Sequence, residues 1–202
     1  MSAPATQRLP RGPHRLSRDE VRASQRGRML EAMARVAAEK GYAATTVADV
    51  IARAGVSRAT FYEHFADKED CFVAAFDAGV DIMLATLESS VDVSGDAPVE
   101  RLDRFLRAYL DLLAAEPAFA RTFLVEVYAA GPRAIERRAE LQGRFVDSIA
   151  DVLETDEHFA CEALVAAISS LVTSKVGAGR ADELPALRRP LVDLVRRTRL
   201  PP

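Results

Sequence analysis

The 202-residue chain is predicted to fold as an all-α protein. Apolar residues recur at i, i+3, i+4 and i+7 over most of its length, and no segment alternates with period two between turns. Gly131, Gly177 and Gly179 mark the ends of periodic segments, and Pro117 and Pro132 fit the starts of others. Hydrophobic residues make up 49% and charged residues 28%, which is typical of a chain that folds around a core.

The periodic segments predict the helices in order. The first runs from about Arg18 to Lys40 and ends at Gly41, and two short helices follow over residues 46–65. A long helix is predicted over about 67–89. Pro117 and Pro132 fit the first turns of later helices, where a missing amide hydrogen costs nothing. These later helices are predicted over about 99–115, 118–129, 133–154, 157–176 and 190–199, with a separate turn at 184–189.

Residues 46–65 predict two short helices joined by a tight turn. Thr46 is an N-cap, and Asp49 three residues later completes a capping box. Gly55 can adopt the left-handed conformation that ends this helix. Ser57 caps the next helix at once. The connection of about three residues is the length found in a helix-turn-helix.

The second of these helices divides its side chains between two faces. Phe61 and Phe65 lie four residues apart and pack inward, which leaves the intervening residues outside. The outer face suits a DNA major groove, since a small residue permits close approach while polar residues donate to bases and phosphates. Lys68 opposes the dipole of the long helix, and a DNA phosphate would explain it. The predicted DNA contacts are Thr46, Ser57, Arg58, Ala59, Thr60, Tyr62, His64 and Lys68; the alternative for each one alone is a solvated side chain.

Charge is distributed unevenly along the chain. Residues 1–45 hold 9 Lys and Arg against 4 Asp and Glu, whereas residues 71–202 hold 15 against 21. A basic N-terminal part on an acidic body is typical of a nucleic-acid-binding unit joined to another domain. Residues 1–17 contain three prolines and several arginines and are predicted to form a flexible basic arm, either a DNA contact or a solvated tail.

The segment TTVADVIARAGVSRATFYEHFADKEDCF resembles the DNA-binding segment of the TetR family of bacterial regulators, and the resemblance covers roughly residues 22–75. The matching features are the Ala-Gly-Val-Ser turn, the Phe-Tyr-x-His-Phe run and the Asp-Lys-Glu that opens the next helix. The resemblance implies about nine helices, a homodimer on a palindromic double-stranded operator, and repression relieved by a small-molecule inducer. It places a helix-turn-helix domain at 18–66 and a ligand-binding and dimerisation domain at 67–202.

An inducer pocket is expected among the middle helices. Its polar groups are few, so a small hydrophobic ligand is expected. A stripe of apolar residues at helical spacing is also what an ordinary core contains. The pocket candidates are Phe76, Met83, Phe105, Tyr109, Phe123, Val127, Tyr128 and Phe145.

The last two helices are predicted to form the dimer interface, because small residues in the first allow close approach and leucines in the second follow a 3-4-3 spacing. The alternative is a core within one protomer. The predicted interface residues are Leu164, Ile168, Leu171, Leu187, Leu191 and Leu194.

Other classes of function lack their motifs. The sequence has no glycine-rich phosphate loop, no GxSxG and no HExxH, so neither catalytic residues nor a cofactor are predicted. His158 and Cys161 could share a metal but lack further ligands, so no metal site is predicted. Two cysteines and no apolar run of membrane-spanning length indicate a cytoplasmic protein with free thiols and no membrane association. A helical interaction module without DNA binding, and an activator in place of a repressor, stay open.

Overall fold

The computed structural model describes residues 17–91 and 96–198, and within them it contains nine α-helices, two 3₁₀ helices and no strand. The all-α prediction is therefore confirmed. The predicted arm at residues 1–17 lies outside the described residues except for Ser17. The elements are α1 (Arg18–Lys40), α2 (Val47–Ala54), α3 (Arg58–His64), α4 (Lys68–Val91), α5 (Pro98–Ala115), α6 (Pro117–Leu124), η1 (Glu126–Ala129), α7 (Pro132–Leu153), α8 (His158–Gly177), η2 (Ala181–Leu187) and α9 (Arg188–Thr198).

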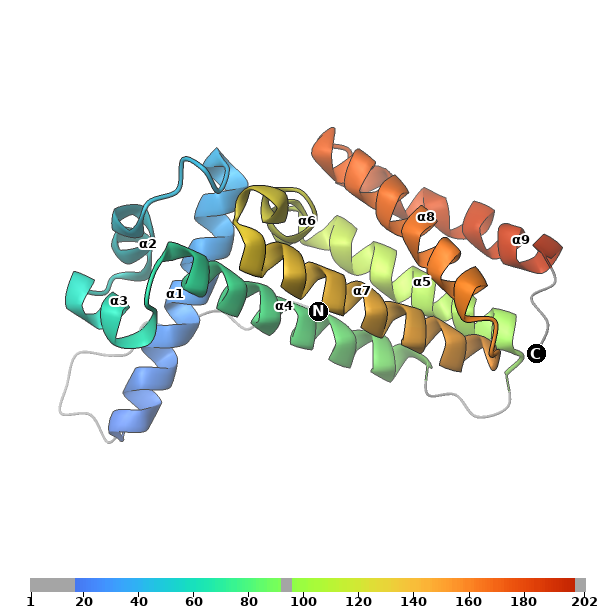
Figure 1. Ribbon diagram of the computed structural model, residues 1–202, viewed down its shortest axis with the longest axis horizontal. Coiled ribbons are helices and arrows are strands. Elements are labelled where there is room, and N and C mark those ends of the chain that lie inside the picture. Colours follow the sequence, from blue (N-terminus) through green and yellow to red (C-terminus); the bar gives the residue numbers. More distant parts are fainter. Residues whose placement is uncertain (1–16, 92–95, 199–202) are drawn as a thin grey trace.

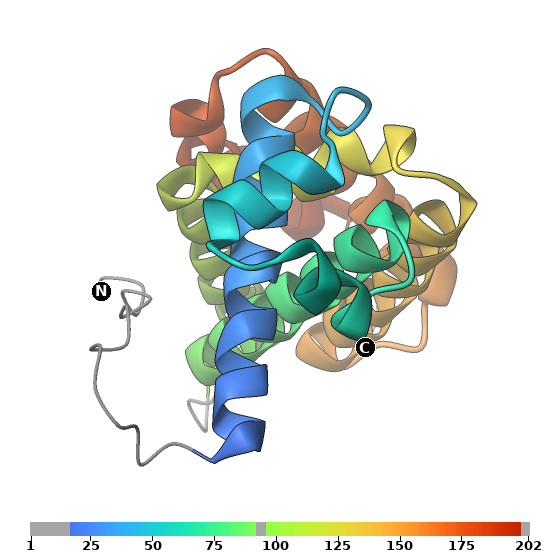
Figure 2. The ribbon, with the colours of Figure 1, turned by 90° about the vertical axis from the view of Figure 1, so that its left-hand side faces the viewer.

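The molecule is elongated, with α1, α2 and α3 gathered at one end and the other helices bundled beyond them (Figure 1). Figure 2 looks onto that end, where α1 crosses the bundle and carries α2 beside it. Helix α4 runs from this end into the bundle, where it packs against α5 and α7. One continuous helix therefore joins the two ends of the molecule.

Local signals in the sequence set the first three helices. The Thr46 hydroxyl accepts a hydrogen bond from the amide of Asp49, and the Asp49 side chain accepts one from the amide of Thr46, which confirms the capping box. Gly55 ends α2 with φ 63° and ψ 43°, a left-handed conformation that glycine adopts without steric cost. Ser57 caps α3 by accepting a hydrogen bond from the amide of Thr60. The helix-turn-helix geometry thus follows from capping residues that the sequence displays.

The core consists of two clusters that meet inside the bundle. One lies beneath α1–α3 and joins Met33, Phe61 and Phe65 to Phe72 of α4 and Phe123 of α6. The other fills the space between α4, α5, α7, α8 and α9. The first cluster continues past residue 66, the predicted end of the DNA-binding domain, into α4, α6 and α7. Packing alone does not separate the two predicted domains.

The predicted helix over 118–129 is wrong in its second half. The α-helix ends at Leu124, and a 3₁₀ turn follows over Glu126–Ala129. This tighter turn brings the Glu126 side chain to the amide of Tyr42, 84 residues away in the chain, at 2.9 Å. Such a tertiary hydrogen bond leaves no trace in the local spacing of apolar residues. The remaining predicted helices are found within two residues of their expected bounds.

Candidate DNA-binding surface and ligand cavity

Helix α3 presents a small polar surface to solvent. Phe61 is fully buried beneath it and packs 5.5 Å, centroid to centroid, from the ring of Phe65. On the opposite side Arg58, Ala59 and Tyr62 are exposed. The guanidinium of Arg58 lies 5.7 Å from the centroid of the Tyr62 ring, and Tyr62 is 49% exposed. The buried phenylalanines thus anchor α3 so that Arg58, Ala59 and Tyr62 lie together on its solvent-facing side.

The other predicted contacts on this helix are partly occupied by its own structure. The hydroxyls of Ser57 and Thr60 lie 2.9 Å apart, and Ser57 is the N-cap. His64 is half-buried at the C-terminal end of α3. Burial and the nearby Arg22 and Arg26 lower the pKa of His64, which keeps the ring neutral near pH 7. The contribution of these three side chains to DNA contact remains a prediction.

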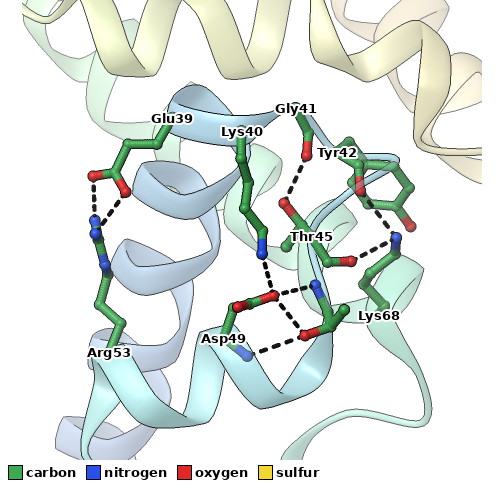
Figure 3. Close-up of polar contacts among 9 residues, drawn as sticks. Glu39, Lys40, Gly41, Tyr42, Thr45, Asp49, Arg53 and Lys68 are labelled. Carbon is green, nitrogen blue, oxygen red and sulfur yellow. Dashed lines mark hydrogen bonds and ion pairs between the residues drawn. The ribbon is translucent and has the colours of Figure 1, made fainter.

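Thr46 belongs to a polar network at the start of α2 (Figure 3). Its hydroxyl lies 2.5 Å from Oδ2 of Asp49, which is also 2.6 Å from the ammonium of Lys40. The hydrogen bond from Lys40, followed by those from Thr46, holds the pKa of Asp49 far below its usual range. On the neighbouring turn, Arg53 of α2 pairs with Glu39 of α1. These contacts fix the orientation of α2 relative to α1, while Thr46 stays exposed.

Lys68 has structural partners that the sequence did not reveal. Its ammonium donates to the backbone carbonyls of Tyr42 and Thr45 at 3.0 and 2.9 Å and lies 4.0 Å from the centroid of the Tyr42 ring (Figure 3). Lys68 therefore holds the loop that leads into α2, which accounts for a cation in the first turn of α4. A direct phosphate contact from Lys68 remains a prediction.

Three arginines of α1, to which no sequence motif assigned a role, contact the buried side of the same surface. Arg28 donates to the carbonyl of Ala54 at 2.6 Å, at the end of α2, and Arg22 donates to the carbonyl of Glu63 at 3.3 Å, near the end of α3. Arg26 lies 4.9 Å from the centroid of the Phe65 ring. Basic residues in α1 thus bind the negative ends of two short helices. The only sequence signal for them was the excess of positive charge.

The end of the molecule that carries α1, α2 and α3 is joined to the bundle by polar contacts as well as by α4. Arg133, in the first turn of α7, pairs with Asp67 at 2.8 Å and with Glu69 at 3.1 Å. The hydroxyl of Thr122 on α6 donates to the carbonyl of Ala34 on α1 at 2.7 Å. Together with the hydrogen bond from Tyr42 to Glu126, these contacts make α6 and the start of α7 part of the support for α1 and the loop after it.

A small, mostly apolar cavity lies inside the bundle. Its volume is about 50 Å³, room for a few water molecules, so a larger ligand requires its side chains to move. Six of the eight predicted pocket residues line it: Phe76, Met83, Phe105, Tyr109, Phe123 and Phe145. Val127 instead lies in the core beneath α1–α3, and Tyr128 is 55% exposed. Helices α4, α5, α6, α7 and α8 all contribute to the wall.

The predicted dimer residues fall into two groups. Leu164, Ile168 and Leu191 are buried in the core of the single protomer, and Leu187 packs against that core. This is the intrachain alternative, and it applies to these four residues because α8 packs against α6 and α7, and α9 packs against α5, within one protomer. Leu171 and Leu194 are 44% and 46% exposed. The expectation that no apolar run is of membrane-spanning length is wrong for α8, which by length and composition could cross a membrane. Of its most apolar window, 33% is buried in the protomer.

Within the described residues, no three His, Cys, Asp or Glu side chains are grouped as metal ligands. His158 lies 3.6 Å from Asp147, and both side chains are about two-thirds exposed. Cys71 and Cys161 are free and buried. No disulfide joins these two residues, in agreement with the free thiols that the sequence predicts.

Comparison with known sequences identifies the N-terminal part. Residues 29–75 match the family described as bacterial regulatory proteins, tetR family. The transcriptional repressor KstR2 of Mycobacterium tuberculosis is 34% identical over 90 residues, 45% of this chain and 44% of that protein. The transcriptional activator FasR of Mycolicibacterium smegmatis is 25% identical over 143 residues, 71% of this chain and 63% of that protein. The N-terminal segment over residues 29–75 is therefore that of the TetR family.

The matched segments span less than two-thirds of the length of these two relatives. Solved structures, in contrast, superpose over more than four-fifths of this chain. The fatty acid degradation regulator FadR of Bacillus halodurans superposes with a TM-score of 0.76 at 21% identity, over 85% of this chain and 94% of that one. FadR of Bacillus subtilis, solved in complex with stearoyl-CoA, superposes with a TM-score of 0.69 at 19% identity, over 84% and 96%. At these identities the likeness concerns the fold.

Proposed function

We propose that this protein is a transcriptional repressor of the TetR family that binds a palindromic operator as a homodimer and leaves it when a hydrophobic small molecule occupies the cavity. The observation that carries the proposal is the outer face of α3, where Arg58, Ala59 and Tyr62 stand exposed above the buried Phe61. Helices of this kind enter the major groove with their N-terminal residues against the bases. Arg58 and Ala59 occupy that end of α3 and are assigned to base edges, and Tyr62 to a phosphate.

The homodimer is supported by the surface of α8 and α9. Leu171 and Leu194 are exposed on these helices, and most of the apolar α8 lacks cover within one protomer. A second copy of the chain would bury this surface and present a second α3. The two recognition helices would then lie about 34 Å apart, one turn of DNA.

Release by ligand is supported by the position of α4 between cavity and DNA-binding surface. Phe76, Val80 and Met83 of α4 line the cavity, while Lys68 at its N-terminal end holds the loop before α2. A ligand larger than the present cavity must move these side chains and can thereby shift α4. Couplings of this type typically amount to about 1–3 kcal/mol.

A gel-shift titration against DNA from upstream of the protein's own gene tests the proposal. Arg58→Ala is expected to weaken specific binding about tenfold or more. Tyr62→Phe is also expected to weaken it, and binding should fall as salt rises. Arg107→Ala, which removes the same charge from the exposed surface of α5, serves as the matched control. Equal binding of all variants to operator and random DNA, also after selection from random DNA, would instead favour the interaction module.

The sign of regulation depends on where the operator lies relative to the promoter. FasR is described as an activator and KstR2 as a repressor, so relatives of both kinds exist. Repression is proposed here, in the cytoplasm, where the DNA is. A reporter fused to the bound promoter tests it, because deletion of this gene should raise expression from that promoter.

A further inference from the structure

Arg138, on α7, is a buried arginine that lines the cavity. It is 6% exposed. Its Nε donates to the hydroxyl of Tyr128 at 3.0 Å and its Nη2 to the hydroxyl of Ser169 at 3.0 Å, and its guanidinium lies 5.1 Å from the centroid of the Tyr128 ring. Every partner that it has among the described residues is neutral. A buried positive charge without a counter-ion is unfavourable, since the lost hydration is not repaid.

The other polar groups of the cavity are also able to donate hydrogen bonds. Ser169 accepts from both Arg138 and Gln142, at 3.0 and 3.4 Å, so its own hydroxyl hydrogen is left to donate elsewhere. Tyr109 also lines the cavity and is 7% exposed, and its hydroxyl can donate a hydrogen bond. Burial raises the pKa of Tyr109 to about 12, so the phenol keeps its proton.

The guanidinium of Arg138 has N–H groups that its hydrogen bonds within the protein do not use. An arginine carries five N–H groups, and the two hydrogen bonds of Arg138 use two of them. No Asp or Glu is among the described residues that line the cavity. The polar side of the cavity therefore carries a single positive charge, several hydroxyl and amide groups that can donate hydrogen bonds, and no negative charge. The rest of its wall is aromatic and aliphatic.

We infer that the ligand of this cavity is a hydrophobic carboxylic acid whose carboxylate pairs with Arg138, with Ser169 and Tyr109 as further donors. The inference rests on the proposed function, which assigns the cavity to the inducer. The carboxylate supplies the counter-charge that Arg138 lacks and accepts two parallel hydrogen bonds from a guanidinium. The hydrocarbon part packs against the aromatic wall, which includes Phe76 and Phe145.

Other head groups fit less well. An alcohol or a thioester can accept a hydrogen bond but leaves the charge of Arg138 unpaired. A phosphate monoester carries about −1.5 to −2 charges near neutral pH. Arg138 is the one Lys, Arg or His among the described residues that line the cavity, so the second negative charge would go unpaired. A single carboxylate matches a single guanidinium.

Isothermal titration of the full chain with decanoate, decanol and decyl phosphate tests the inference. Arg138→Met keeps a long side chain and removes the charge. Decanoate is expected to bind the unchanged protein and to bind R138M roughly 30-fold more weakly, as for loss of hydrogen bonds to a charged group. Decanol is expected to bind both proteins alike and more weakly than decanoate. Arg137→Met is the matched control, because the neighbouring Arg137 pairs with Asp77 and Glu140 outside the cavity.

The free protein supplies a second measurement. If Arg138 is an unpaired charge kept for a ligand, R138M should raise the melting temperature in the absence of ligand. If Arg138 only bridges Tyr128 and Ser169, R138M should lower it, and the inference is overturned. It is also overturned if the unchanged protein does not bind decanoate, if R138M or decanol matches its affinity, or if decyl phosphate binds more tightly. DNA binding is measured separately, so failure of the proposed function shows in the gel shift and not in these titrations.

Discussion

Replacing Gly79 by alanine tests how closely α4 and α6 pack beside the cavity. A β-carbon at Gly79 would lie far inside van der Waals contact of Phe119 Cε2, and 3.1 Å from Phe119 Cζ and Phe123 Cε2. Both phenylalanine rings line the cavity, and they pack on each other with centroids 4.7 Å apart. Phe119 therefore cannot move without disturbing Phe123 and the cavity wall.

Two effects oppose each other in Gly79→Ala. Alanine in a helix interior is favoured over glycine by about 1 kcal/mol, whereas overpacking of a filled site costs about 1–3 kcal/mol. Gly143, within α7, provides the matched control, since a β-carbon there would meet nothing within 4 Å. Gly143→Ala should gain stability from the helical preference alone. The expected free energy of unfolding of G79A is thus about 1–3 kcal/mol below that of G143A.

Urea unfolding followed by circular dichroism measures both variants under the same conditions. If G79A is as stable as G143A, the close approach of α4 and α6 is not rigid and the argument fails. The same variant displaces Phe119 into or away from the cavity. Decanoate affinity is therefore expected to change in G79A and to stay unchanged in G143A.

Three further predictions concern Lys68, the Cys71 thiol and the exposed leucines of α8 and α9. Lys68→Met leaves the carbonyls of the loop before α2 without their donor and should cost about 1 kcal/mol in urea unfolding; unchanged stability with weaker DNA binding would assign Lys68 to a phosphate alone. Burial raises the pKa of the Cys71 thiol from 9.0 to about 12. The contribution of the protonated thiol to the free energy of unfolding is therefore complete below pH 9 and is lost as pH rises towards 12. At pH 10 about 1.4 kcal/mol of this contribution is lost. Between pH 7.5 and 10 the free energy of unfolding of Cys71→Ala should therefore fall by correspondingly less than that of the unchanged protein; equal falls would refute this. Leu171→Glu combined with Leu194→Glu should give monomers in analytical ultracentrifugation, whereas Ile135→Glu, at an equally exposed site, should not; dimers of the double variant would place the interface elsewhere.

The parts of the fold that the sequence predicted are those that depend on neighbours in the chain. The caps at Thr46 and Ser57 and the turn at Gly55 act over three or four residues, so their residue types are sufficient. The outer face of α3 followed from the spacing of Phe61 and Phe65, because two buried positions on a short helix determine which side is exposed.

The parts that were missed depend on contacts between distant residues. The hydrogen bonds from Lys68 to the loop before α2, and from Tyr42 to Glu126, join positions 23 to 84 residues apart. The spacing of apolar residues in α8 does not determine which neighbour covers them. Leu164 and Ile168 were therefore predicted to contact a second protomer, although they lie in the core of one protomer. Arg138 gave no sequence signal, because its burial arises only when α7 packs against α8.

The continuous core beneath α1–α3 has a consequence for how this protein can change its target sequence. Phe61 and Phe65 pack on side chains of α4, and the same cluster includes Phe123 of α6 and Ala134 of α7. A recognition unit cut out after residue 66 and grafted onto another body would lose this cover and expose its aromatic underside. New operator specificity is therefore more accessible by single exchanges at the solvent-facing positions of α3, such as Ala59, which leave the underside intact. Single substitutions on the outer face of α3 would therefore disturb the core less than an exchange of the whole recognition unit.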